Sequence, residues 1–222
     1  MANSYSRMST HTKCGLKYRF AYVDQIAIDK TGQEMGPALV RGNRLHDSVE
    51  GFYLGTCELD PDLVFHAQWL SSMKDLYDCK PELKWGITED WEACDFDSED
   101  AYIRGIWDLA VFPTTTNQPL DIKEWKSGKI YPEHGDQRYL YSMAALITYP
   151  EYPKVKTDTV YFDQKESRFE EWGPERLPSM KAHFTTKIKL MGMEQTWIPN
   201  PGFHCKWCDF SKANGGPCAF GG

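Results

Sequence analysis

Apolar residues recur at helical spacing in five stretches of the chain. Gly36-Pro37 precedes an apolar stripe and predicts a helix start, because proline is tolerated in the first turn of a helix. Asp60-Pro61 is typical of a helix cap and a first helical residue, and it predicts a helix that runs to about Cys79. The other helical segments are 4–23, 137–149 and 176–193.

Alternation of apolar and polar residues, typical of a half-buried strand, marks the middle and later parts of the chain. The strands predicted from it are 101–112, 120–126, 155–163 and a short one at 169–172. The polar segment 113–119 predicts an antiparallel hairpin between the first two strands. From Trp197 the chain is rich in Pro, Gly and Cys, which predicts an irregular tail. The pattern therefore predicts an α/β fold with a helical N-terminal part and a cysteine-rich C-terminal tail.

Composition narrows the class of protein. The 222 residues suit one substantial core, and we expect a single domain over 1–222. No apolar run approaches the roughly 18 residues that cross a bilayer, and the N-terminus has no apolar signal segment, so we expect a cytoplasmic protein with no membrane partner. Seven cysteines, an odd number without an export signal, favour metal ligation over a disulfide framework.

The net charge of −7 is unevenly distributed along the chain. Residues 75–100 hold ten acids and two bases, a local charge of −8, so the rest of the chain sums to +1. Segment 1–46 has seven bases and three acids, a local charge of +4. A polyanion such as DNA or RNA can therefore bind locally despite the low isoelectric point. We interpret the acidic run itself as a solvated face.

Charged residues gather on the predicted hairpin. Strand alternation places Glu124 and Lys126 on one face, and the hairpin brings Asp108 to the same face. Two neighbouring carboxylates repel unless a cation lies between them, and hard oxygen ligands suit Mg²⁺ or Mn²⁺. His46 on the predicted second helix offers a further ligand, with Glu50 one turn later. From spacing alone, the ordinary solvated face of a strand is the alternative interpretation.

Four short motifs follow one another along the chain: Gly42-x-x-x-His46, Gly105-x-x-Asp108, Glu124-x-Lys126-Ser-Gly and Gln137-x-x-x-Tyr141. This series resembles the RecB-type nuclease branch of the PD-(D/E)XK superfamily, over most of the chain. The resemblance implies a restriction-endonuclease-like central mixed sheet flanked by helices. Trp107 stands where the superfamily name has proline. The resemblance also implies that His46, Asp108 and Glu124 bind Mg²⁺ or Mn²⁺ and that Lys126 is catalytic.

The last motif and the expected activity come from the same resemblance. Gln137 and Tyr141 share a helix face at i, i+4 and are implied to lie near the DNA. The implied function is metal-dependent hydrolysis of DNA phosphodiester bonds, and we expect an exonuclease that prefers single-stranded DNA or free ends. An acid can precede the second motif in this family, and Glu89 is the candidate for it. The compact length favours a stand-alone nuclease from a phage or a CRISPR-like locus, acting in the cytoplasm of a phage-infected host.

A competing register, Asp121-x-Lys123, lies three residues before the preferred acid–lysine pair. We prefer Glu124/Lys126 because Ser-Gly-Lys follows it directly, as Thr-Gly-Lys or Ser-Gly-Lys does in relatives. Both residues of the competing pair would also point to the face opposite Leu120.

Three cysteines lie in the tail, Cys205-x-x-Cys208 and Cys218. Such spacing is compatible with zinc, an iron–sulfur cluster or a redox dithiol, and the third thiol disfavours the dithiol. Cys14 is the candidate fourth ligand. One early and three late cysteines resemble the layout of the iron–sulfur members of this nuclease branch, which include the CRISPR-associated RecB-like exonucleases and the AddAB helicase–nuclease.

The cysteine layout therefore implies a [4Fe–4S] cluster that ties Cys14 to the 197–222 tail. A Zn²⁺ site that uses His204 or His11 is the alternative. The remaining thiols, Cys57, Cys79 and Cys94, are expected to be buried or inert.

Two other functions stay open from the sequence. One is a non-catalytic nucleic-acid-binding or assembly module that keeps a structural iron–sulfur or zinc site. The other, less favoured, is a zinc-stapled RNA-binding protein. The intact set of Asp108, Glu124 and Lys126 favours the enzyme, since a nuclease that has lost its activity usually loses at least one of these residues.

Overall fold

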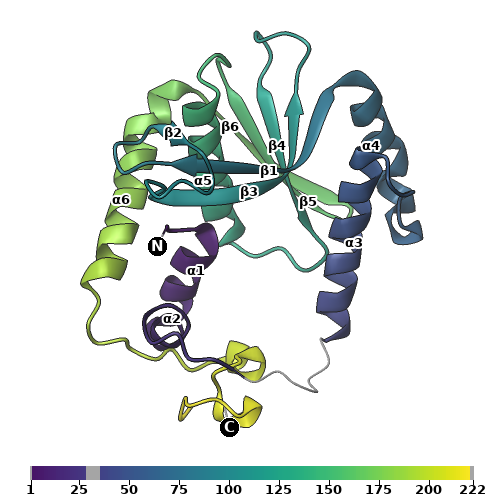
Figure 1. Cartoon of the computed structure of the whole chain (residues 1–222). Helices are drawn as coiled ribbons and strands as arrows, with labels where there is room; N and C mark the ends of the chain where they lie inside the picture. The colour runs from purple at the N-terminus through teal and green to yellow at the C-terminus, as the bar shows by residue number, and fades with distance from the viewer. Residues whose placement is uncertain (1, 29–35, 221–222) are drawn as a thin grey trace. The chain divides into compact units, whose positions relative to one another are not determined.

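The computed structural model describes residues 2–28 and 36–220, and the chain forms two compact units (Figure 1). The sheet unit is Met1–Ala2 with Met35–His183, and the terminal unit is Asn3–Glu34 with Phe184–Gly222. The single domain expected over 1–222 stays a prediction. No helix within the described ranges is both long and apolar enough to span a membrane.

The sheet unit is built on one six-stranded sheet in the order β2-β1-β3-β4-β5-β6. Its strands are β1 Asp78–Ile87, β2 Ala93–Cys94, β3 Ile103–Phe112, β4 Leu120–Lys126, β5 Val155–Tyr161 and β6 Glu166–Trp172. Strands β4 and β5 pair in parallel and every other neighbouring pair is antiparallel. The sheet is therefore mixed, and the predicted α/β fold and the hairpin between β3 and β4 are confirmed.

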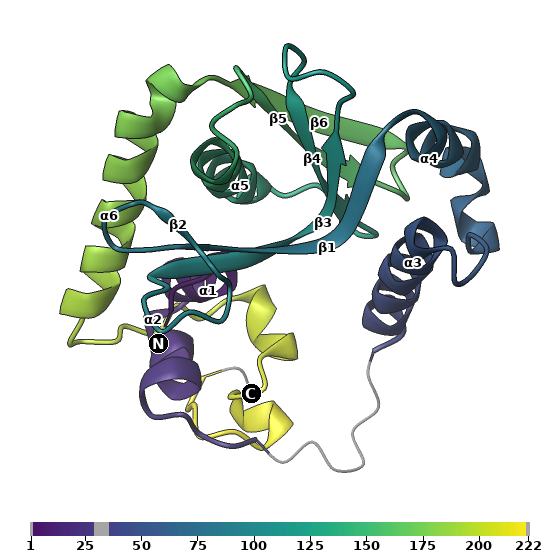
Figure 2. The same cartoon turned by 45° about the horizontal axis from the view of Figure 1, so that its top comes forward.

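Helices cover both faces of this sheet (Figures 1 and 2). Helices α3 (Pro37–Leu54) and α4 (Val64–Leu76) lie on one face and α5 (His134–Thr148) on the other. Helix α3 begins where the sequence predicted, with Gly36 as its cap. The core beneath α3 and α4 joins apolar residues of both helices and of the turn before α4 to those of β3, β4, β5 and the residue after β5: Leu45, Val49, Tyr53, Leu63, Leu70, Met73, Leu109, Val111, Trp125, Val160 and Phe162.

The prediction for the acidic run was wrong in two places. The helix expected to reach Cys79 ends at Leu76, and the ten-residue strand β1 follows almost at once. Strand β1 contains Pro81 and several charged residues, and its first half is largely polar and partly exposed. Because charged residues occupy many of its positions, β1 lacks the apolar–polar alternation that predicts a strand. Nine residue pairs with β3 fix its position in the sheet.

The terminal unit has a helical N-terminal part and a tail of short turns. The helix predicted over 4–23 is interrupted at Cys14, whose backbone is extended, with φ −163° and ψ 109°. The interruption separates α1 (Tyr5–Lys13) from α2 (Gly15–Tyr18), which continues into a π-helical turn at Arg19–Val23. The tail forms 3₁₀ turns at Phe203–Trp207 and Lys212–Asn214. Helix α6 (Leu177–Met193) contains the boundary between the two units.

Candidate active site

The candidate active site lies where β3 and β4 separate. Their antiparallel ladder pairs Leu109 with Lys123, and continuing this register by one step sets Asp108 opposite Glu124. The Asp108 Oδ2 atom accepts a hydrogen bond from the backbone N–H of Trp125 at 2.6 Å. The Trp125 N–H is thus bonded to a carboxylate and not to a carbonyl oxygen of β3. This hydrogen bond holds the Asp108 side chain beside Glu124.

His46 reaches the same point from α3. Its Nε2 atom lies 3.0 Å from the carbonyl oxygen of Trp125, and its Nδ1 atom lies 3.6 Å from Asp108 Oδ2. Because a carbonyl oxygen can only accept, the first contact places the ring proton on Nε2. Burial lowers the pKa of His46, which favours the neutral ring that a metal ion requires. A Cβ on Gly42, one turn earlier, would lie 3.0 Å from Ser127 Oγ, so the glycine of the first motif lets α3 approach β4.

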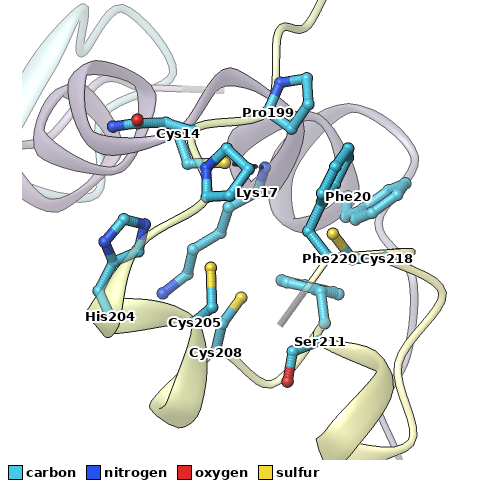
Figure 3. A pocket seen from close by; sticks show the side chains of 13 residues that line it. Cys14, Lys17, Phe20, Pro199, His204, Cys205, Cys208, Ser211, Cys218 and Phe220 are labelled. Carbon is cyan, nitrogen blue, oxygen red and sulfur yellow. Dashed lines mark hydrogen bonds between the residues drawn. The ribbon is translucent and has the colours of Figure 1, made fainter. Parts of the chain in front are cut away.

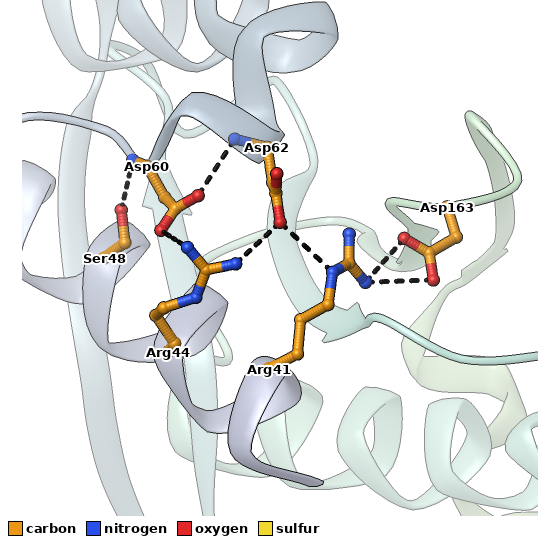
Figure 4. A network of polar contacts seen from close by, with 6 residues as sticks. All are labelled: Arg41, Arg44, Ser48, Asp60, Asp62 and Asp163. Atoms are coloured by element: carbon orange, nitrogen blue, oxygen red, sulfur yellow. Dashed lines mark hydrogen bonds and ion pairs between the residues drawn. The ribbon is translucent and has the colours of Figure 1, made fainter. Parts of the chain in front are cut away.

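A network of ion pairs holds the N-terminal half of α3 in place (Figure 4). Arg44 bonds Asp60 at 2.6 Å and Asp62 at 2.7 Å. Arg41 bonds Asp62 at 3.2 Å and Asp163, just after β5, at 2.8 Å. These exposed pairs contribute little stability individually, but the network ties the helix that carries His46 to the loop before α4 and to the end of β5.

Glu124 and Lys126 complete the cluster. Their side chains form a close ion pair through Glu124 Oε1, while Glu124 Oε2 is buried with no hydrogen-bond partner. Burial, and then the charge of Glu124, raise the pKa of Asp108 well above its usual range. Burial alone would lower the pKa of Lys126, but the negative charges of Glu124 and Asp108 outweigh burial, so the pKa is raised. Two crowded carboxylates, one with an unpartnered buried oxygen, are a donor set that fits a divalent cation.

Glu82 on β1 is a member of this cluster that the sequence reasoning missed. The β1–β3 register pairs Pro81 with Leu109 and Leu83 with Trp107, so Glu82 lies across from Asp108. Its φ of +48° is unusual for a non-glycine residue inside a strand. Burial, then the charges of Glu50 and Glu124, raise the pKa of Glu82. Glu82 is therefore an acid that precedes the second motif in the sequence and lies at the cluster in the structure.

Glu89, the acid that the sequence suggested for that position, follows β1 in a turn. It lines a separate acidic hollow that also includes Glu92 and Glu99. Because β1 is not among the strands that the sequence pattern predicts, neither acid can be placed against Asp108 from the sequence alone.

Gln137 and Tyr141 meet as the i, i+4 spacing predicts. Gln137 Nε2 donates to the Tyr141 hydroxyl at 3.1 Å, and the two residues are only 6% and 7% exposed. The Tyr141 ring packs edge-on against Trp85, 6.1 Å between centroids. A Cβ on Gly105 would lie 2.5 Å from the Trp85 ring, which explains the glycine of the second motif by packing. The role of this pair at the DNA stays a prediction.

The competing pair lies on the opposite face of β4. Lys123 is 2% exposed and bonds Asp121 at 2.8 Å and Asp158 at 3.1 Å. Its charge is therefore held between two carboxylates away from Asp108, whereas Lys126 shares the cluster of Asp108 and Glu124.

Four cysteines line one small hollow in the terminal unit (Figure 3). Cys14 comes from the break between α1 and α2, and Cys205, Cys208 and Cys218 come from the tail. The space enclosed is about 20 Å³, and His204 also lines it. The other three cysteines belong to the sheet unit, so they lie apart from the four predicted thiols. None of the three is buried, since Cys57 is exposed and Cys79 and Cys94 are half-buried, and their inertness stays a prediction.

Comparison with known proteins gives the family. Residues 2–213 match the family model of the PD-(D/E)XK nuclease superfamily. The fold is similar to that of a protein from Eubacterium rectale assigned as an exonuclease, with a TM-score of 0.54 and 9% identity over 96% of this chain and 88% of that one. The crystal structure of SSO0001 gives a TM-score of 0.49 and 14% identity over 99% of this chain and 86% of that chain. A search of curated proteins finds no match. Because the family model covers most of its length, the chain belongs to the PD-(D/E)XK nuclease superfamily.

Proposed function

We propose that this protein is a Mg²⁺- or Mn²⁺-dependent deoxyribonuclease of the RecB-like branch, acting as an exonuclease on single-stranded DNA or free ends. The observation that carries the proposal is the buried, unpartnered Glu124 Oε2 beside Asp108 and Lys126. Such a carboxylate pair is costly to keep charged without a cation, and a nuclease uses that cation in catalysis. Membership of the superfamily supports hydrolysis of phosphodiester bonds.

Each residue of the cluster has a role in this proposal. His46, Asp108 and Glu124 would hold the cation, and the Trp125 carbonyl oxygen offers a fourth ligand. With the ring proton on Nε2, bonded to that oxygen, His46 would use Nδ1, which lies 3.6 Å from Asp108 Oδ2. When bound, a divalent cation supplies Lewis acidity and lowers the pKa of a bound water. Lys126 would hold the attacking water or neutralise the charge that develops on the phosphate.

Digestion of end-labelled DNA tests the activity. We expect single-stranded DNA carrying a 5′ or a 3′ label to be shortened in Mn²⁺ or Mg²⁺ and to stay intact in EDTA. An exonuclease releases mononucleotides or short oligonucleotides from one end within the first minutes. An endonuclease produces random internal fragments. Tight DNA binding with no cleavage in either metal would contradict the proposal and favour a non-catalytic binding module.

We further propose that Cys14, Cys205, Cys208 and Cys218 hold a [4Fe–4S] cluster, as in the iron–sulfur CRISPR-associated RecB-like exonucleases that the chain resembles. The support is that these four thiols line one hollow in the terminal unit. Four thiolates are the usual ligand set of such a cluster. Protein purified without oxygen should be brown and contain about four irons per chain. One zinc and no iron per chain would replace the cluster with a Zn²⁺ site.

A further inference from the structure

A groove of aromatic and basic side chains lies on the sheet face opposite Glu124 and Lys126. One hollow of about 360 Å³ is lined by Phe65 and Trp69 of α4, and by lysines and an aromatic residue of the sheet and the β5–β6 turn. The residues that characterise it, which we call the basic aromatic groove, are Phe65, Trp69, Lys123, Lys156, Lys165 and Phe169. All six belong to the sheet unit.

Each lysine of the basic aromatic groove lies over an aromatic ring. Lys165 Nζ is 4.6 Å from the centre of the Phe65 ring, and Lys156 Nζ is 4.7 Å from the centre of the Phe169 ring. Lys123, on the buried floor, lies 5.5 Å from the Trp69 ring. Phe65 is 60% exposed and Phe169 is 57% exposed. Two large apolar rings therefore face solvent, and each has a lysine ammonium group beside it. Exposed apolar rings of this kind often mark a binding surface, and the cations beside them favour a ligand with both flat apolar groups and negative charge.

The charges show which groups a ligand would meet. The hollow holds three lysines against Asp158 and Glu166, and both acids already have partners. Asp158 is only 4% exposed and bonds Lys123, and Glu166 bonds Arg168 at 2.9 Å.

At the rim, the two accessible cations are therefore Lys165 and Lys156. Lys156 also lies 3.5 Å from Asp121, and its side chain stays 25% exposed. Exposed rings beside accessible ammonium groups are complementary to unpaired bases joined by phosphates.

The groove continues beyond the first hollow. A second hollow, of about 440 Å³, shares Trp69, Lys123 and Lys156 with the first and continues toward Pro113 and Gln118 at the β3–β4 turn. In the second hollow, Asp121 and Glu171 balance the charges of the two shared lysines. The first hollow is therefore the basic end of the groove. An extended ligand fits this shape better than a single small molecule.

We propose that the basic aromatic groove binds an unpaired stretch of nucleic acid at a distance from the hydrolytic cluster. The bases stack on Phe65 and Phe169, and the phosphates contact Lys156 and Lys165. The inference rests on the proposed function, since the bound strand is another part of the same DNA. Its consequence is that long substrates are held at two places and short ones only at the active site.

Binding and cleavage are measured separately to test this. Affinity for labelled dT20 is measured by fluorescence anisotropy in EDTA, for the full chain and for the variants Phe169→Ala and Lys156→Ala/Lys165→Ala. Lys80→Ala, an exposed lysine on β1 that pairs with Asp78, is the matched control. Thermal melting confirms that each variant is folded. Cleavage of labelled dT6 is then followed in Mn²⁺.

We expect each groove variant to bind dT20 about tenfold more weakly, and the double lysine variant to show a shallower dependence of affinity on salt. Cleavage of dT6 should be unchanged in both, and Lys80→Ala should resemble the wild type. Unchanged dT20 affinity in folded groove variants, with normal wild-type binding and cleavage, overturns this inference alone. A wild-type protein that neither binds dT20 nor cleaves dT6 overturns the proposed function as well.

Discussion

His46 is anchored to the backbone of Trp125, with its Nε2 atom 3.0 Å from the carbonyl oxygen of that residue. The N–H of the same residue is bonded to Asp108. The Trp125 side chain points to the other face, where it stacks on Phe162 at 5.6 Å. One strand residue thus orients two site side chains through its peptide groups and supports the core through its indole. The positions of His46 and Asp108 therefore depend on the backbone of β4 at residue 125 and not on the Trp125 side chain.

Lys126 should be essential for cleavage. Lys126→Ala removes the cation nearest Glu124, and we expect DNA hydrolysis to fall about 10²–10³-fold because charge on the phosphate is no longer neutralised. End-labelled single-stranded DNA in Mn²⁺ is the assay. Lys129→Ala, an exposed lysine three residues later, is the matched control and should keep its activity. Comparable activity of Lys126→Ala and the wild type would show that the assignment is wrong.

The same assay decides between the two registers. Lys123→Met removes a buried charge from between Asp121 and Asp158, so it should lower stability strongly. Under conditions where the variant is folded, we expect it to retain cleavage. A folded Lys123→Met that is less active than Lys126→Ala would favour the competing pair.

The raised pKa of Asp108 has a consequence for stability. The folded protein keeps this proton at a pH where the unfolded chain, with a pKa of about 3.9, has lost it. The stabilising contribution is therefore complete below the unfolded pKa and is lost as the pH rises through the folded pKa. In EDTA, Asp108→Asn should unfold at a higher urea concentration than the wild type at pH 8 and show no advantage at pH 4. A wild type that is the more stable form at pH 8 would contradict this.

Glu82 should contribute to metal binding although it lies outside the recognised motifs. Glu82→Gln removes a charge opposite Asp108, and we expect the affinity for Mn²⁺, measured by calorimetric titration, to fall several-fold. The control is Glu89→Gln, which changes an acid of a separate hollow. Equal Mn²⁺ affinities in the two variants would remove Glu82 from the site.

The four clustered cysteines should act as one unit. Cys14→Ala should lose the brown colour and much of its solubility, because one missing ligand opens the cluster and a metal-dependent staple contributes directly to folding. Cys57→Ala, in the sheet unit, should change neither property. Absorbance near 400 nm and iron content per chain are the measurements. A brown, soluble Cys14→Ala protein would exclude Cys14 as a ligand.

Gly105 should be required for packing. A Cβ at this position would lie 2.5 Å from the Trp85 ring, so Gly105→Ala should destabilise the protein by about 1–3 kcal/mol in chemical unfolding. Gly128 has no atom within 4 Å of such a Cβ and makes Gly128→Ala a neutral control. Equal unfolding midpoints for the two variants would show that the sheet adjusts at Gly105 without cost.

The sequence was sufficient where the determining interactions are local. Alternation over 120–126 and the polar turn before it predicted β4 to the residue, together with its hairpin to β3. Gly36-Pro37 predicted the start of α3 in the same way. In these cases, strand periodicity, turn chemistry and helix capping act within a few residues, so they can be seen in the sequence itself.

Tertiary structure decided what depends on residues far apart in the chain. Strand β1 is recognisable by its pairing with β3, since its own charges conceal the alternation, and without β1 Glu82 had no place opposite Asp108. Lys123 and Lys126 are chemically alike in the sequence. The pairing of β4 with β5 sets Lys123 beside Asp158, whereas the separation of β3 from β4 leaves Lys126 with the carboxylates of the candidate site. Sequence periodicity assigns a side chain to a face, but long-range pairing of strands and helices determines which charges that face brings together.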